Sequence, residues 1–166
     1  MLHGPTPLDS TLRLTKFESG NAALDDWLRN HALQAHRSGS TRVFVAHDDD
    51  GVVLGFYALS AGSVAPKQAP RRVRKGLGAY PIPVALIARL GVSQDAQGTG
   101  LGAALLKDAL LRIDHAAESL GVRAALAHAK DERARSFYEH FGFEPSQAHA
   151  LWMFLLMKDL RASMKR

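Results

Sequence analysis

An apolar segment that runs into a glycine-rich turn and then into a helical pattern constrains the fold of this chain most. Residues 84–92 read VALIARLGV, which is typical of a strand buried on both faces. The turn Gln97-Gly98-Thr99-Gly100-Leu101-Gly102 follows. Residues 103–120 then carry apolar side chains at helical spacing, and Gly121 ends this predicted helix. A buried strand that leads through a tight turn into a long amphipathic helix indicates an α/β fold.

The remaining segments extend this pattern to a mixed α/β domain. Asp48-Asp49-Asp50-Gly51 lies between two segments rich in Val, Phe and Tyr, so it predicts a hairpin. We predict strands at residues 11–17, 41–47, 52–61, 84–92, 124–127 and 152–157, and helices at residues 22–36, 103–120 and 131–141. The stretch from Ser63 to Pro83 is rich in proline and basic side chains, and we expect it to be irregular.

Length and composition limit the classes of protein that the chain can represent. The chain has 166 residues, of which 46% are apolar, so we expect one domain over residues 1–166 with short flexible ends at about 1–8 and 161–166. It contains no cysteine, which excludes disulfides, iron–sulfur clusters and a thiol nucleophile. The start, Met1-Leu2-His3-Gly4-Pro5, lacks the features of a signal peptide. We therefore expect a cytoplasmic protein with no membrane segment.

The charge balance favours anionic partners. Lys and Arg number 21 against 16 Asp and Glu, which gives a formal net charge of +5. The most basic segment is Arg71-Arg72-Val73-Arg74-Lys75. It can contact nucleic-acid phosphates, or it can be a solvated loop without a ligand.

The glycine-rich turn is a candidate phosphate site. Glycines allow the backbone to approach a ligand closely, and the free N–H groups at the start of a helix favour an anion. The alternative is a tight turn without a ligand. A Walker loop is excluded because no Gly-Lys-Ser/Thr is present. A nicotinamide or flavin cofactor is disfavoured because the dinucleotide fingerprint matches only as Gly98, Gly100 and Ala103, without an acid after the next strand.

A second candidate feature is the aromatic segment around Tyr138. Phe137 and Phe141 are four residues apart and are predicted to face the core, with Tyr138 at the edge of that face. Spacing alone fits a catalytic tyrosine and a structural tyrosine equally well.

These two features together resemble the GNAT superfamily of N-acetyltransferases. Residues 92–102 are similar to its acetyl-CoA pyrophosphate loop, and residues 134–143, ARSFYEHFGF, are similar to its tyrosine-bearing helix. Residues 17–28 and the Pro81-Ile82-Pro83 segment before Leu90-Gly91-Val92 further resemble the GNAT toxins of bacterial toxin–antitoxin pairs. The resemblance covers about residues 12–160 and implies the GNAT fold, a central, mostly antiparallel sheet with flanking helices.

The resemblance also implies a cofactor and a set of site residues. Acetyl-CoA would place its pyrophosphate on the backbone of Gln97, Gly98, Thr99, Gly100, Leu101 and Gly102, and its pantetheine along Leu90, Gly91 and Val92. Tyr138 would be the general acid that protonates the departing thiolate. Asp131 stands where many members have Asn, which puts a cofactor hydrogen bond from that side chain in doubt. His128, Asp131 and Glu132 are candidates for a general base by position only, with His128 favoured as a structural residue.

The toxins of this family acetylate the amino group of aminoacyl-tRNA and thereby block translation. An α-amine has a pKa of about 8, so roughly a tenth of it is neutral at pH 7 and little base catalysis is needed. The resemblance implies tRNA contact through Arg71, Arg72, Arg74 and Lys75, with Arg133 and Arg135 as weaker candidates. It also implies an antitoxin of ribbon–helix–helix type and a homodimer. Two alternatives stay open: a GNAT enzyme that acetylates a small amine or a protein amino group, and a non-catalytic GNAT-fold module that binds nucleic acid or an antitoxin.

Overall fold

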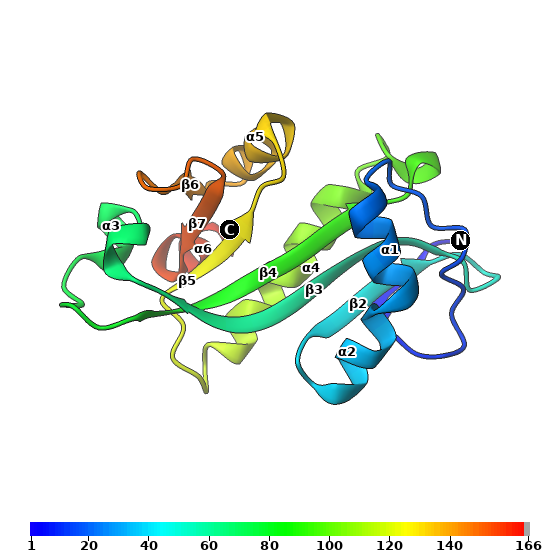
Figure 1. The fold of residues 1–166 in the computed structure, drawn as a ribbon, viewed down its shortest axis with the longest axis horizontal. Helices are drawn as coiled ribbons and strands as arrows, with labels where there is room; N and C mark the ends of the chain where they lie inside the picture. Colours follow the sequence, from blue (N-terminus) through cyan, green and yellow to red (C-terminus); the bar gives the residue numbers. More distant parts are fainter. Residues whose placement is uncertain (165–166) are drawn as a thin grey trace. The chain divides into compact units, whose positions relative to one another are not determined.

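The computed structural model describes residues 1–164, which form two compact units (Figure 1). The first unit comprises Met1–Ser60 and Ala88–Ala109, and the second comprises Ala61–Ile87 and the residues from Leu110 onward. The strands are β1 (His3–Pro7), β2 (Arg42–His47), β3 (Val53–Val64), β4 (Ile82–Val92), β5 (Ala124–His128), β6 (Glu144–Pro145) and β7 (Trp152–Leu156). The helices are α1 (Ala22–Asn30), α2 (Ala32–Ser38), α3 (Arg71–Arg74), α4 (Leu101–Ala116), α5 (Glu132–His140) and α6 (Met157–Met164), with short 3₁₀ turns η1 (Pro66–Gln68) and η2 (Gln94–Ala96).

The strands confirm the predicted mixed, mostly antiparallel sheet. They follow the order β1-β2-β3-β4 and then β4-β5-β7-β6. β1 with β2, β2 with β3, β5 with β7 and β6 with β7 are antiparallel, whereas β4 and β5 are parallel. The Asp48–Gly51 turn joins β2 to β3, so the predicted hairpin is also confirmed.

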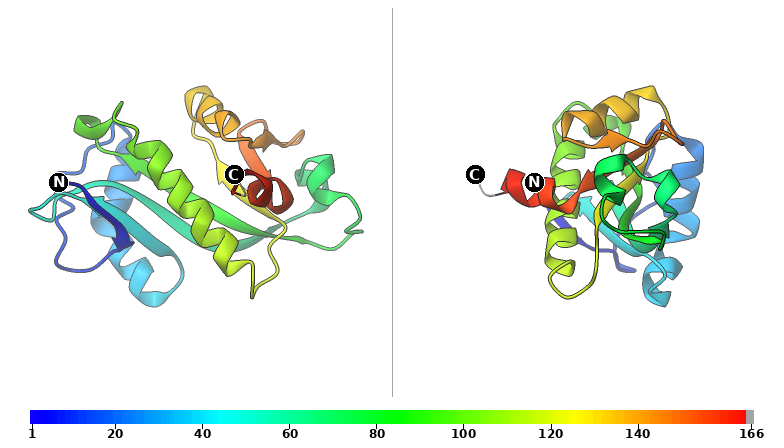
Figure 2. Two further views of the ribbon diagram at one scale, coloured as in Figure 1. Left: turned by 180° about the vertical axis from the view of Figure 1, so that it is seen from behind. Right: turned by 90° about the vertical axis from the view of Figure 1, so that its left-hand side faces the viewer.

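In the first unit, helices cover both faces of the β2–β3 hairpin (Figures 1 and 2). Leu28 of α1 and Ala32 of α2 pack with Phe56 and other residues of one face. Leu105 of α4 packs with Tyr57 on the opposite face. Neighbouring side chains of a strand point to opposite faces, so Phe56 and Tyr57 belong to different core clusters.

In the second unit, one apolar cluster joins α3 to the sheet. Val73 of α3 and Ile82 of β4 are fully buried in it with Phe154 of β7. Helix α5 begins at an N-cap formed by Asp131, whose carboxylate accepts a hydrogen bond from the Ala134 N–H at 2.8 Å. α6 follows β7 directly in the chain.

Several sequence-based expectations differ from the structure. The strand predicted at residues 11–17 is wrong: this segment makes only an isolated bridge between Arg13 and Val52. The stretch expected to be irregular contains η1 and α3. The short flexible ends were expected at residues 1–8 and 161–166. Residues 3–7 form β1 and residues 161–164 belong to α6, while 165 and 166 lie outside the described residues.

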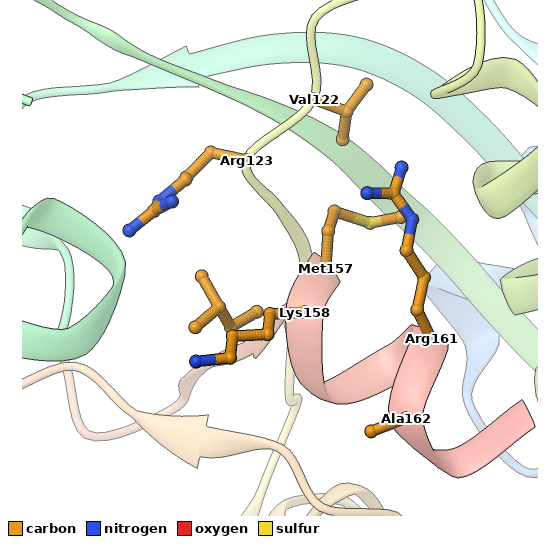
Figure 3. A pocket seen from close by; sticks show the side chains of 7 residues that line it. Val122, Arg123, Met157, Lys158, Arg161 and Ala162 are labelled. Carbon is orange, nitrogen blue, oxygen red and sulfur yellow. The ribbon is translucent and has the colours of Figure 1, made fainter. Parts of the chain in front are cut away.

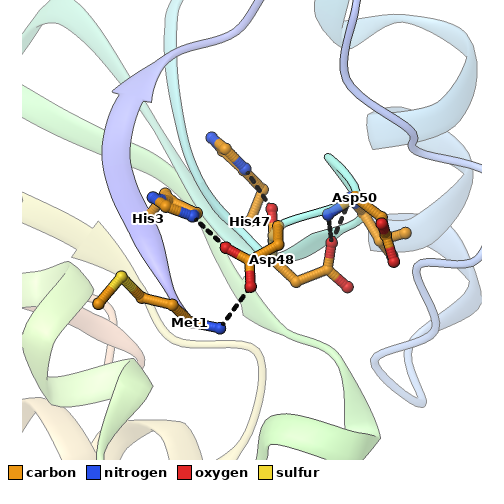
Figure 4. Close-up of polar contacts among 7 residues, drawn as sticks. Met1, His3, His47, Asp48 and Asp50 are labelled. Atoms are coloured by element: carbon orange, nitrogen blue, oxygen red, sulfur yellow. Dashed lines mark hydrogen bonds and ion pairs between the residues drawn. The ribbon is translucent and has the colours of Figure 1, made fainter.

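Strand β1 was missed because it is polar and proline-containing, and its partners are distant in sequence. His3 pairs with His47 across the two strands, and their rings stack at a centroid distance of 5.3 Å. The His3 Nε2 also lies 2.7 Å from a carboxylate oxygen of Asp49, a contact that Figure 4 draws as a dashed line from the labelled His3. Contacts of this kind hold an edge strand that has no apolar alternation of its own. In residues 1–164, no helix has the length and apolar character needed to cross a membrane.

Candidate functional site

The parallel pairing of β4 with β5 involves only the first part of β4. The parallel pairs run from Val84 with Ala124 to Ile87 with Ala127, whereas β4 continues to Val92. Within the described chain, β5 ends at His128, so residues 89–92 of β4 extend beyond it. Unpaired strand edges offer N–H and C=O groups to an extended ligand. This is the position where an extended amide chain can pair with Leu90, Gly91 and Val92.

The glycine-rich turn gives α4 an open N-terminus. Gly98 and Gly100 have φ angles of 79° and 89°, a region that side chains disfavour, and a Cβ on either would have open space around it. The first helical hydrogen bond of this region runs from the Ala104 N–H to the Gly100 carbonyl at 3.1 Å. The N–H groups before Ala104 lie in the first turn of the helix, where no carbonyl within the helix accepts from them. N–H groups at a helix N-terminus can bind an anion such as a diphosphate.

Gln97 braces this turn with its side chain. Its amide nitrogen donates to the carbonyls of Ser19 and Val92, each at 2.9 Å. Its own backbone N–H donates to the Gln94 carbonyl at 3.2 Å. Of the six residues expected to hold the pyrophosphate, Gln97 therefore fixes the loop, and Gly98 to Gly102 supply the free backbone.

Gly91 is required by packing. A Cβ at this position would lie 2.5 Å from Leu24 Cδ2 and 3.2 Å from Phe56 Cε1. The absence of a side chain therefore allows α1 to lie close against β4. No sequence pattern predicts this contact, because Leu24 and Gly91 are far apart in the chain.

Tyr138 is held in place by neighbouring rings, and its hydroxyl is available. Its side chain is 7% exposed, with ring centroids of Phe137 and Phe143 at 5.3 and 5.2 Å. Burial raises the pKa of the phenol above its usual value of about 10. Within residues 1–164 the Tyr138 hydroxyl makes no hydrogen bond. A protonated phenol without a protein partner is suited to donate to a ligand.

The three candidates for a general base have other environments. Asp131 caps α5, which accounts for its side chain without a cofactor contact. Glu132 lies 3.8 Å from Arg135 on the surface of the same helix. The His128 ring stacks on Trp152 at 4.6 Å, and burial, followed by the nearby His149, lowers the pKa of His128 below its usual 6.5. The structure thus gives Asp131 and His128 structural contacts.

The basic segment forms the short helix α3. Arg71, Arg74 and Lys75 are exposed. Arg72 instead makes a two-pronged ion pair with Asp159, with N–O distances of 2.6 and 2.9 Å. Three of the four predicted tRNA-contacting side chains are thus free to meet a phosphate backbone.

Comparison of the chain with known protein families identifies the family to which it belongs. The model of the acetyltransferase (GNAT) domain matches residues 39–145, which include β4, the glycine-rich turn and Tyr138. The chain belongs to the GNAT acetyltransferase family. The expected superfamily and enzyme class are thereby confirmed.

One relative and two solved structures are similar to nearly the whole of this GNAT chain. A "tRNA-acetylating toxin" of Mycobacterium tuberculosis (strain ATCC 25618 / H37Rv) is 51% identical over 149 residues, which cover 90% of this chain and 89% of the relative. The structure of AtaT complexed with acetyl-methionyl-tRNAfMet superposes with a TM-score of 0.87 at 24% identity, covering 98% of both chains. A mutant AtaT toxin bound to the C-terminus of the antitoxin AtaR and to acetyl-CoA matches with a TM-score of 0.82 at 23% identity, covering 100% of this chain and 98% of that one. These two structures share the fold of this GNAT chain.

Proposed function

We propose that this GNAT protein transfers the acetyl group of acetyl-CoA to the α-amino group of an aminoacyl-tRNA and so blocks translation, as the toxin of a toxin–antitoxin pair. The observation that carries the proposal is the 51% identity to a tRNA-acetylating toxin over 90% of this chain. Each unit supports it separately: the first has the open N-terminus of α4, and the second has the available phenol of Tyr138 and the exposed cations of α3.

Acetyl-CoA fits the residues that the chain offers. The open space around Gly98 and Gly100 allows phosphate oxygens to reach the backbone N–H groups that begin α4. The end of β4, at Leu90, Gly91 and Val92, offers its backbone to the amides of the pantetheine. When bound, acetyl-CoA supplies the acetyl group as a thioester. We propose that the two compact units serve together as one catalytic domain.

Tyr138 is the proposed proton donor to the leaving group. The neutral α-amine attacks the acetyl carbon, a C–N bond forms, the C–S bond breaks, the nitrogen gives up a proton and the sulfur gains one. A phenol is already protonated at neutral pH and burial raises the pKa of Tyr138 further, so its hydroxyl can donate a hydrogen bond to the sulfur. Stabilisation of the developing thiolate by that hydrogen bond is the main expected contribution, since a phenol is a weaker acid than a thiol.

The exposed cations of α3 are the proposed contact with the tRNA backbone. Arg71, Arg74 and Lys75 can each neutralise a phosphate, which makes binding depend on salt. We also propose a ribbon–helix–helix antitoxin as partner, a homodimeric toxin and a cytoplasmic location. The matched complex of AtaT with the C-terminus of AtaR supports an antitoxin partner.

The test is an acetylation assay with radiolabelled acetyl-CoA and total charged tRNA. Labelled acetyl-aminoacyl-tRNA is the expected product. Deacylated tRNA and free amino acids are the controls and should acquire no label. The variant Tyr138→Phe serves as the matched catalytic control. Label on a free polyamine or a protein, with none on charged tRNA, would overturn the proposed substrate in favour of a small-amine or protein acetyltransferase. Failure to bind acetyl-CoA at all would indicate a non-catalytic module.

A further inference from the structure

Helix α3 is too short to be stable by itself, yet the structure fixes it at three points. It has four residues, whereas isolated helices of fewer than about 12 residues are marginal in water. Its position therefore depends on contacts with the rest of the second unit. These contacts come from Val73, Arg123 and Asp159.

The first point is apolar. Val73 is fully buried and packs in one cluster with Val84, Leu126 and Phe154. This contact holds one face of α3 against the sheet. It leaves the flanking side chains Arg71, Arg74 and Lys75 exposed.

The second point is Arg123, which lies just before β5. Its Nε donates to the Val73 carbonyl at 2.9 Å, and its Nη2 lies 3.3 and 3.4 Å from the carbonyls of Arg72 and Lys75. Figure 3 shows its guanidinium extended away from Met157 and toward α3. A cation at the last carbonyls of a helix satisfies acceptors that have no partner within the helix.

The third point is Asp159 of α6, which holds the Arg72 guanidinium with both carboxylate oxygens. This hydrogen-bonded pair lowers the pKa of Asp159 and raises that of Arg72. A two-pronged pair fixes orientation as well as distance. α3 is thus held from β5 by Arg123 and from α6 by Asp159.

We propose that Arg123 and Asp159 are positioning residues for the tRNA substrate, because they orient α3 so that its exposed cations meet the phosphate backbone. This inference rests on the proposed function. Arg123 and Asp159 do not contact the tRNA in this proposal. Their role is to hold α3 in the orientation that binds it. The proposal also assigns Arg72 to the anchoring of α3, in place of the tRNA contact that the sequence indicated.

The proposal makes a prediction opposite to that of simple electrostatics. Replacing Asp159 by Asn removes a negative charge beside a surface that binds a polyanion, so charge alone predicts tighter tRNA binding. Loss of the fixed orientation of α3 predicts weaker binding instead. Asp114 provides a matched control, because it pairs with Arg161 at 3.2 Å and its replacement by Asn changes the net charge equally.

The experiment compares Asp159→Asn, Asp114→Asn, Arg123→Ala and Arg123→Lys with the wild type, at several salt concentrations. For Asp159→Asn and Arg123→Ala we expect KM for aminoacyl-tRNA to rise about tenfold, with kcat at saturation and the Kd for acetyl-CoA within about twofold. Arg123→Lys keeps one donor and should recover part of the loss. Asp114→Asn should match the wild type or bind tRNA slightly more tightly.

Two outcomes would overturn the inference. One is tighter tRNA binding by Asp159→Asn, equal to that of Asp114→Asn, which would show that only charge matters. The other is an equal loss of kcat and acetyl-CoA affinity, which would show a general loss of folding. Failure of the proposed function is recognised separately, because the wild type would then acetylate no charged tRNA.

Discussion

The phenol of Tyr138 combines burial with a free hydroxyl. Phe137 and Phe143 lie against its ring, and burial raises the pKa of a hydroxyl that is already protonated at neutral pH. Because the hydroxyl has no hydrogen-bond partner in residues 1–164, its removal breaks no contact that stabilises the fold. A change at this atom therefore separates catalysis from stability.

Tyr138→Phe should lower kcat by roughly 10²-fold or more, because the departing thiolate loses the hydrogen bond from the phenol. The Kd for acetyl-CoA, measured by calorimetry, should stay nearly the same. The melting temperature should also change little, which distinguishes this variant from one that unfolds. An unchanged kcat would remove Tyr138 from the mechanism.

At single residues, the sequence indicated local roles better than distant ones. Tyr138 and the glycines at 98 and 100 could be proposed as site residues because a turn or a helix face is a local property. The brace from Gln97 to the Ser19 carbonyl and the pair between Arg72 and Asp159 join residues that are far apart in the chain. No spacing rule predicts such partners, so the role of each of these side chains needed the structure.

The packing of α1 against β4 includes a close approach of Leu24 to Gly91. A Cβ at residue 91 would overlap the Leu24 side chain and crowd the Phe56 ring, so these side chains would have to shift. We expect Gly91→Ala to lower the free energy of unfolding by about 1–3 kcal/mol, as overpacked cores do. Urea unfolding measures this loss.

A second variant isolates the contact. Leu24→Ala removes the overlapping atoms, so the double variant should be less destabilised than the sum of the two single variants. Additive losses would contradict the assigned clash and would place the effect of Gly91→Ala in the backbone.

Helix α2 is tied to β2 by a histidine that must be neutral. The Val43 N–H donates to His36 Nδ1 at 3.0 Å, and burial, followed by the charge of Arg42, lowers the pKa of His36 below 6.5. A lowered pKa in the folded state means that this stabilisation is present above pH 6.5 and is lost as pH falls through the folded-state pKa. At pH 7.5, His36→Ala should cost about 1 kcal/mol, the usual worth of one hydrogen bond.

The measurement is urea unfolding of both proteins from pH 7.5 to pH 5. The difference between wild type and His36→Ala should shrink as pH falls, because protonation removes the acceptor in the wild type. A difference that stays constant over this range would show that His36 contributes by packing alone.

Helices and strands were predicted correctly where the sequence pattern was strong and were missed where it was weak. The helices around residues 22–36, 103–120 and 131–141 and the hairpin across Asp48–Gly51 were predicted because apolar periodicity or turn residues identify them. β1, β6 and α3 were missed because their sequences carry no apolar alternation, and α6 was missed because its residues were assigned to the end of a strand and to a flexible tail. Such elements exist only through contacts with other segments, and a single sequence contains no record of those contacts.

Over the whole molecule, the net charge of +5 does not show which cations can bind an anionic partner. That depends on which of them already pair with carboxylates or backbone carbonyls. Arg123 satisfies backbone carbonyls, while Arg72 and Arg161 are paired with carboxylates. Arg71, Arg74 and Lys75 are exposed on one short helix and the residue after it. The sequence could count these charges, but it could not show which of them are neutralised.

Replacing Arg71, Arg74 and Lys75 together by Ala, with Arg72 kept to hold α3, should weaken tRNA binding and flatten its salt dependence. Each phosphate contact contributes a slope of about 0.7–0.9 in log affinity against log salt, so the slope should fall by about 2. Filter binding between low and physiological salt measures both quantities. A charge-matched control replaces the exposed Arg13, Lys16 and Arg37 of the first unit. If that control flattens the slope as much as the α3 variant, only net charge attracts the tRNA and α3 is not its contact.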